Sequence, residues 1–145
     1  MRICFDLGAV FYDGASDEDN ALALQALLEA LVAIDRVYLR RYGSQVPKLY
    51  QSGVRYGRTQ VWDSTPDLLT RRYGDCKSLT AMYVAELREQ GEPARPVFRF
   101  AMNPQTGRKD FHILVQRGDG TFEDPSRKLG MEAYHRAHNI WIFPS

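Results

Sequence analysis

The chain has 145 residues, 44% of them hydrophobic, and a formal net charge of +1 at pH 7, which is the composition of a soluble globular protein. The small net charge argues against nucleic acid as a partner. No apolar run is long enough to cross a membrane, and an acid within the first six residues argues against a signal peptide. We therefore expect a single domain over residues 1–145 and a cytoplasmic location.

The N-terminal part is expected to form a strand followed by one long helix. Apolar side chains alternate along residues 2–12, and the following Asp-Gly pair closes the predicted strand. Ser16 is a suitable helix N-cap, and the three acids after it favour the positive end of a helix dipole. Apolar residues then recur every three or four positions up to about Tyr42, before the stop signal at Gly43. We expect this helix to be the main packing element.

The middle of the chain predicts less regular structure and then a short helix. Proline and glycine break up residues 44–63, where only residues 54–56 suggest a short extended piece. Thr65 is followed by proline and aspartate, which is a helix-start signal. This helix is expected to end near Gly74.

A second cysteine stands at the predicted start of another helix, in the stretch "RRYGDCKSL". Asp75 is a good N-cap, Cys76 takes the first helical position, and Gly91 closes the helix. The free N–H groups and the dipole at a helix start favour thiolate, so we expect a lowered pKa for Cys76. Two cysteines are too few for a disulfide framework, although a single bridge to Cys4 is not excluded by sequence. Lys77 is interpreted as a solvated lysine, with support of the thiolate as the alternative.

The C-terminal part predicts a small sheet and a short helix. Residues 95–101 and 110–117 have strand patterns, and residues 121–124 follow a Gly-Asp-Gly turn. A short helix is expected at residues 131–138. It contains two histidines, His135 and His138, which have no third ligand nearby; they are interpreted as surface residues, and neither a metal nor a cofactor is expected.

The predicted hairpin brings a histidine and an acid to one face. If the three residues 118–120 form the loop, Asp124 lies opposite Leu114 and diagonal to His112. A carboxylate at that diagonal position could reach the imidazole. A two-residue loop would shift the register by one and move Asp124 to the other face.

Cys76, His112 and Asp124 then have the chemistry of a nucleophile, a base and an orienting acid. The sulfur would attack an acyl carbon, the imidazolium would protonate the leaving group, and the carboxylate would hold the ring. The backbone N–H of Cys76 is the first expected oxyanion donor. Trp62 and Gln60 are candidates for the second, with Trp62 preferred.

Several motifs together resemble the transglutaminase-like branch of the papain-like cysteine fold, over about residues 50–131. They are "TPDLLTRRYGDCKSLTAMYVAELREQGEPARPVFRF", "DFHILV" and "EDPSRKLGM". "LYQSGVRY" and "DPSRKLGM" make the resemblance closest to small proteins encoded by bacteriophages and prophages. The resemblance implies an α+β fold in which a cysteine-bearing helix packs on an antiparallel sheet, with Cys76, His112 and Asp124 in catalytic roles. Two departures leave the shape of the acyl pocket open: Lys77 follows Gly-Asp-Cys, and Leu114 replaces a tryptophan common in the family.

Two functions follow as alternatives. The first is a thiol-dependent acyl-transfer enzyme acting on a peptide or protein: a peptidase, amidase, deamidase or transamidase. The second is a non-catalytic phage assembly or virion accessory module that binds phage structural proteins and keeps the fold as a platform. The location would be the host cytoplasm or the virion. A third, weaker alternative is a nucleic-acid binder using the arginines at residues 36–41 and 55–58.

Overall fold

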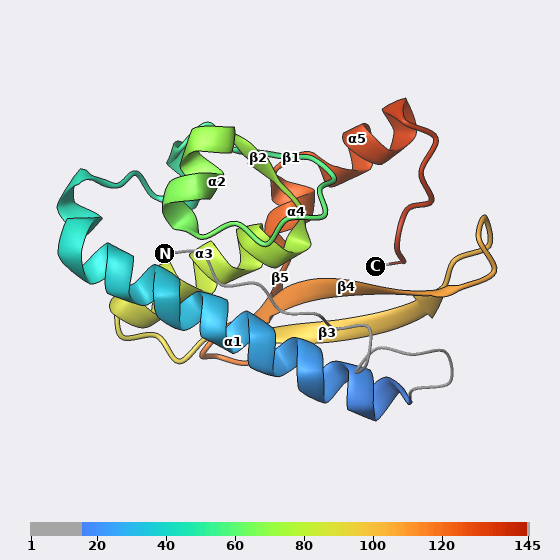
Figure 1. Cartoon of the computed structure of the whole chain (residues 1–145), viewed down its shortest axis with the longest axis horizontal. Helices are drawn as coiled ribbons and strands as arrows, with labels where there is room; N and C mark the ends of the chain where they lie inside the picture. Colours follow the sequence, from blue (N-terminus) through green and yellow to red (C-terminus); the bar gives the residue numbers. More distant parts are fainter. Residues whose placement is uncertain (1–15, 145) are drawn as a thin grey trace.

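The structure is a computed structural model that describes residues 16–144. Figure 1 shows helices grouped around a small sheet. The helices are α1 (Asp17–Tyr42), α2 (Thr65–Arg71), α3 (Cys76–Glu89), α4 (Pro125–Lys128) and α5 (Met131–Ala137), with 3₁₀ turns at Gly43–Gln45 and Leu49–Gln51. The strands are β1 (Arg55–Tyr56), β2 (Tyr73–Gly74), β3 (Arg95–Met102), β4 (Lys109–Gln116) and β5 (Phe122–Glu123). The expected strand at residues 2–12 lies outside the described residues.

The long helix α1 has the boundaries that its sequence predicts. The Ser16 hydroxyl accepts a hydrogen bond from the Asp19 N–H at 3.1 Å, and the helix ends before Gly43. Its buried side chains, Leu24, Leu28, Leu31 and Val32, face the core. Burying an aliphatic side chain of this size contributes about 1.5–3 kcal/mol, so the packed face of α1 is a main source of stability.

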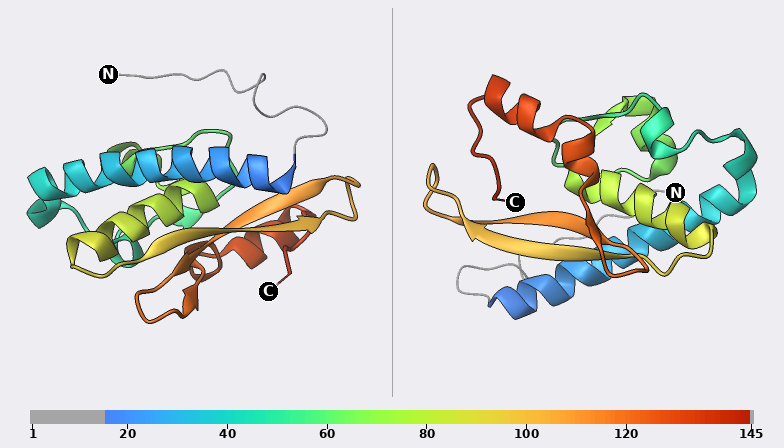
Figure 2. Two further views of the ribbon diagram at one scale, coloured as in Figure 1. Left: turned by 90° about the horizontal axis from the view of Figure 1, so that it is seen from below. Right: turned by 180° about the vertical axis from the view of Figure 1, so that it is seen from behind.

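Helix α3 is the central element of the fold. It packs against α1 and both long strands, and eleven of its residues are buried. Arg88 of α3 forms a two-bond ion pair with Glu29 of α1 at 2.7 and 3.0 Å and also donates to the Ala94 carbonyl. Figure 2 shows α1 and α5 on opposite sides of the molecule, so α3 is enclosed between elements from both ends of the chain.

The sheet consists of β3, β4 and β5 in antiparallel order, and β1 pairs in parallel with β2 in a separate ladder. The Arg117 N–H donates to the Thr121 carbonyl at 2.7 Å, which closes a three-residue loop. Val115 then pairs with Glu123. The odd-length loop required to bring Asp124 to the face of His112 is therefore confirmed, as is the mixed helix-and-sheet fold.

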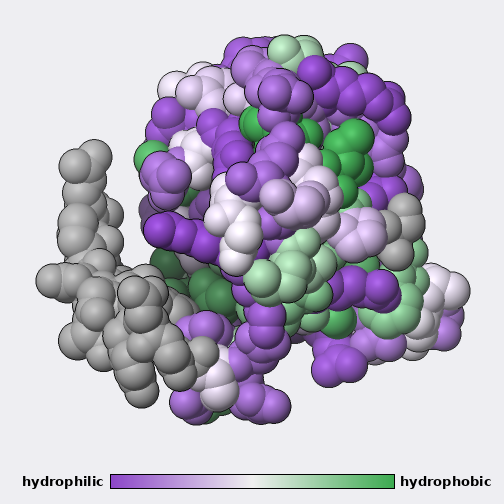
Figure 3. Space-filling model, turned by 90° about the vertical axis from the view of Figure 1, so that its right-hand side faces the viewer, coloured by the Kyte–Doolittle hydropathy of each residue, from purple (hydrophilic) through white to green (hydrophobic). Residues whose placement is uncertain are grey.

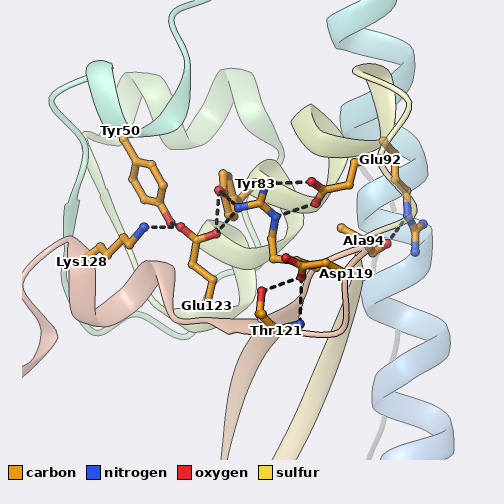
Figure 4. Close-up of polar contacts among 10 residues, drawn as sticks. Tyr50, Tyr83, Glu92, Ala94, Asp119, Thr121, Glu123 and Lys128 are labelled. Carbon is orange, nitrogen blue, oxygen red and sulfur yellow. Dashed lines mark hydrogen bonds and ion pairs between the residues drawn. The ribbon is translucent and has the colours of Figure 1, made fainter.

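A polar cluster fixes β5 against α3 (Figure 4). The Glu123 carboxylate accepts hydrogen bonds from the Tyr83 hydroxyl at 2.7 Å and from Arg117 at 3.0 Å, and it pairs with Lys128 of α4. Because these partners come from α3, β5's own hairpin and α4, they hold the strand in position. The next residue, Asp124, is thereby fixed at the start of α4.

Two buried acids join loops to helices. Asp35 of α1 accepts from the Thr65 N–H at 2.7 Å, and Glu86 of α3 accepts from the Leu49 N–H at 2.6 Å. Burial raises the pKa of each carboxyl group to about 7, although these hydrogen bonds act in the opposite direction. Both groups are thus close to half-protonated at neutral pH.

None of the helices in residues 16–144 is both long enough and apolar enough to cross a membrane.

Candidate active site

The start of α3 holds Cys76 in a tightly packed setting. The Asp75 side chain accepts from the Lys77 N–H at 3.2 Å, as expected for an N-cap. Gly74 immediately before it pairs with Tyr56 in the parallel ladder. A Cβ atom at Gly74 would lie 2.6 Å from a methyl of Leu68, so any larger residue would require that side chain to move. The position of Cys76 is therefore fixed by its neighbours on both sides.

His112 and Asp124 form a direct pair. The His112 Nε2 atom lies 2.8 Å from Asp124 Oδ2, and the imidazole is buried. A carboxylate can only accept, so Nε2 carries the ring proton and Nδ1 keeps a lone pair. Asp124 is also the N-cap of α4, where it accepts from the Arg127 N–H at 3.1 Å, and the Arg127 guanidinium lies 3.3 Å from it.

A cavity of about 290 Å³ lies between the start of α3 and β4. Cys76 and His112 both line it, and the Ile113 backbone N–H is hydrogen-bonded to the sulfur. Gln60 also lines this cavity, whereas Trp62 does not. The remaining lining residues are Tyr56, Arg58, Thr59, Asp75, Lys77, Lys109, Asp110, Phe111, Met131, His135, Ile140, Trp141 and Phe143.

Lys77 is not solvated as expected from sequence. It is buried, forms an ion pair with Asp75 and donates to the Thr59 carbonyl at 3.2 Å. Its ammonium also lies 6.0 Å from the ring centre of Trp62. A buried cation needs partners of this kind, and here protein groups take the place of water around the ammonium. The indole of Trp62 packs beside Lys77; its role as an oxyanion donor stays a prediction.

The segment after α5 forms the wall behind His112. The Phe143 ring is buried and its centre lies 5.5 Å from that of the imidazole; the Trp141 ring is tilted against it at 5.6 Å. Arg127 donates to the Phe143 carbonyl at 2.7 Å, so the side chain beside Asp124 also holds this segment. Figure 3 faces this end of the molecule and shows apolar surface mixed with polar surface.

Within residues 16–144 no three His, Cys, Asp or Glu side chains gather to hold a metal.

The sequence model of the Transglutaminase-like superfamily matches residues 24–129. The chain belongs to this superfamily. Neither a curated protein nor a solved structure matches the chain significantly. The matched region of this transglutaminase-like domain contains Cys76, His112 and Asp124, and it ends before α5. The resemblance to the family is therefore confirmed, while a phage relationship stays a prediction.

The thiol of this transglutaminase-like domain differs from the sequence expectation. Cys76 is partly exposed, yet burial of its sulfur raises the pKa to about 12, and the adjacent Asp75 charge acts in the same direction. Lys77 and the Ile113 N–H lower the pKa, but by less. The lowered pKa expected from the helix start is wrong, because desolvation outweighs the dipole, whose effect is typically 0.3–1 kcal/mol, or about 2 kcal/mol in partly buried sites. Without a bound substrate, Cys76 is therefore protonated at neutral pH.

The raised pKa predicts how Cys76 reacts with a neutral alkylating reagent. Thiolate is the reactive form, so the rate should rise by about tenfold per pH unit up to pH 10. Alkylation by iodoacetamide is measured by mass spectrometry from pH 6 to pH 10 in a Cys4→Ser chain, so that only Cys76 reacts. A plateau reached below pH 8 would contradict a buried, protonated thiol.

A second histidine lies in the cavity of the transglutaminase-like domain. His135, interpreted from sequence as a surface residue, is buried, whereas His138 is exposed. The His135 Nε2 atom lies 3.0 Å from the Tyr56 hydroxyl, and Nδ1 lies 3.0 Å from the Trp141 carbonyl oxygen. The contact with Tyr56 arises only because α5 folds onto β1, so no local sequence signal could have revealed it.

Proposed function

We propose that the domain is a thiol-dependent acyl-transfer enzyme that acts on an amide bond of a peptide or protein. The observation that carries this proposal is the shared cavity. Cys76 and His112 both line it, and the Nε2 atom of His112 is hydrogen-bonded to Asp124. A nucleophile from a helix start, with a base and an orienting acid from one hairpin, suits acyl transfer better than any structural role.

The acylation step follows from the proton positions. His112 Nδ1 has the free lone pair, so it takes the proton from the Cys76 sulfur as that sulfur bonds to the substrate carbonyl carbon. The C–N bond then breaks, and the same proton passes from Nδ1 to the departing nitrogen. The products are a thioester on Cys76 and a free amine. Asp124 stabilises the charge on the ring during the transfer.

The thioester is resolved by a second nucleophile. Water or an amine gives its proton to His112 Nδ1 while its oxygen or nitrogen bonds to the acyl carbon, and the proton returns to the sulfur as the C–S bond breaks. Water gives peptidase, amidase or deamidase activity, and an amine gives transamidase activity. The Cys76 N–H has no acceptor within α3 and is available to the oxyanion, with the Gln60 amide, which lines the cavity, as the candidate for the second donor in place of Trp62.

An electrophilic amide probe tests this proposal. We expect the wild-type chain to be labelled at Cys76, with labelling abolished in Cys76→Ala and reduced by about 10³-fold or more in His112→Ala. His138→Ala is the matched control, because this histidine is exposed and outside the cavity. Labelling at Cys76 that proceeds equally fast without His112 would show that the imidazole is not the base, and the enzyme proposal would fail.

One observation favours the binding-platform alternative: the free thiol is protonated, with a pKa raised by burial. A site that has lost turnover could retain such a thiol. In that case a phage assembly or virion accessory module would use the fold to bind structural proteins. Copurification with a capsid or tail complex, with unchanged phage yield for Cys76→Ala, would favour this function; a lower yield would favour the enzyme.

A further inference from the structure

We propose that the Tyr56 hydroxyl oxygen binds the N–H group of the amide or amine that takes part in acyl transfer. This inference deepens the proposed function and rests on it. Tyr56 and Cys76 line the same cavity, and the hydroxyl of Tyr56 is held by His135. The ligand class is therefore a nitrogen-bearing one, a carboxamide or a primary amine, in preference to an ester.

The proton positions make the Tyr56 oxygen an acceptor. The Trp141 carbonyl can only accept, so His135 carries its proton on Nδ1, at 3.0 Å from that oxygen. Burial lowers the pKa of His135, so the ring is neutral at pH 7 and Nε2 has a lone pair. The Tyr56 hydroxyl must then donate to Nε2, at 3.0 Å. Its own proton is thereby committed, and its oxygen lone pairs remain.

Tyr56 is held beside the thiol by its backbone as well. In the parallel ladder it pairs with Gly74, two residues before Cys76, and its N–H donates to the Leu129 carbonyl at 2.9 Å. Burial, followed by the neighbouring Cys76 and Asp75, raises the pKa of Tyr56 and keeps the phenol neutral. A neutral acceptor with a fixed position suits an N–H group, and a committed proton makes Tyr56 unsuitable as an oxyanion donor.

Three other acceptors of the cavity each have a partner of their own. Asp75 is paired with Lys77, and Asp110 accepts from the Asn103 side chain at 2.8 Å. The Thr59 carbonyl accepts from the same lysine. His112 Nδ1 is reserved for the reacting proton. The Tyr56 oxygen differs from these groups in being a neutral acceptor whose own proton is committed, which suits the selection of nitrogen over oxygen in a substrate.

Two alkylating reagents of similar size test the inference without requiring turnover. Chloroacetamide offers an N–H group, and methyl chloroacetate does not. Each rate is measured at Cys76 in a Cys4→Ser chain and divided by the rate with free cysteine. We expect the amide-to-ester ratio to fall about 3- to 10-fold in Tyr56→Phe, the size of one hydrogen bond. Tyr50→Phe is the matched control, since Tyr50 lies outside the cavity, and its ratio should not change.

A measurement on the unmutated tyrosine covers the case in which Tyr56→Phe does not fold. N,N-Dimethylchloroacetamide lacks the N–H group, so in the Cys4→Ser chain its normalised rate should fall below that of chloroacetamide by a similar factor. An amide-to-ester ratio unchanged within twofold in folded Tyr56→Phe, or equal normalised rates for the two amides, would overturn the inference. Neither result affects the enzyme proposal, which is tested separately by whether probe labelling depends on Cys76 and His112.

Discussion

Replacement of Asp124 by asparagine should lower the rate of acylation by the amide probe by about 10³–10⁴-fold in a chain that still folds. Asparagine caps a helix as well as aspartate does, so its carbonyl oxygen can still accept from the Arg127 N–H. Its amide group, however, would donate to His112 Nε2. The ring proton would then move to Nδ1, the nitrogen that must receive the thiol proton.

The matched control for this variant is Asp119→Asn. Asp119 lies in the exposed hairpin loop and accepts from the Thr121 N–H at 2.9 Å, so it also exchanges a local acceptor for an amide. Acylation of the control should proceed at the wild-type rate, as measured by probe kinetics with intact mass. An Asp124→Asn chain that retains more than a tenth of the wild-type rate would show that the carboxylate does not set the tautomer.

The buried carboxyl group of Asp35 should make the free energy of unfolding depend on pH. Burial raises the pKa of Asp35 from 3.8 to about 7, so between these values the folded chain binds a proton that the unfolded chain has released. The free energy of unfolding therefore decreases as pH rises through this window. Asp35 should contribute about 2–3 kcal/mol more stability at pH 5 than at pH 8.

Asp35→Asn removes this dependence while keeping an acceptor for the Thr65 N–H. Urea unfolding at pH 5 and pH 8 gives the free energies for variant and wild type, and their difference cancels the other titrating groups. The free energy of unfolding of the variant minus that of wild type should be larger at pH 8 than at pH 5, by the same amount of about 2–3 kcal/mol that is expected for Asp35. Glu86→Gln, at the second buried acid, should show the same sign. A difference that is constant with pH would show that Asp35 ionises normally.

Local chemistry was sufficient to predict the elements that carry the site. The N-cap residues Ser16 and Asp75 define the starts of α1 and α3, because their side chains satisfy free backbone N–H groups. The alternation of a strand, combined with loop parity, predicts that Asp124 reaches His112, and the 2.8 Å distance agrees with this geometry. Both arguments use only residues close together in the sequence.

The environment of the site could not be predicted in the same way. Lys77 is buried because the Thr59 carbonyl and Asp75 close over it, and His135 is buried because α5 folds back onto Tyr56. The pKa of Cys76 depends on desolvation by many segments together, which no single motif reports. The buried acid Asp35 is likewise one of many acids in a helix until its partner loop is known.

Arg127 links the proposed triad to the segment of the chain that follows α5. Its side chain lies beside Asp124, donates to the Phe143 carbonyl and pairs with Glu132 at 3.0 Å. A polypeptide shortened after α5 would keep all three polar side chains of the proposed triad. It would still lose the aromatic shield of His112 and open that imidazole to water. The structural support of the proposed triad therefore extends beyond the family boundary at residue 129, to at least Phe143.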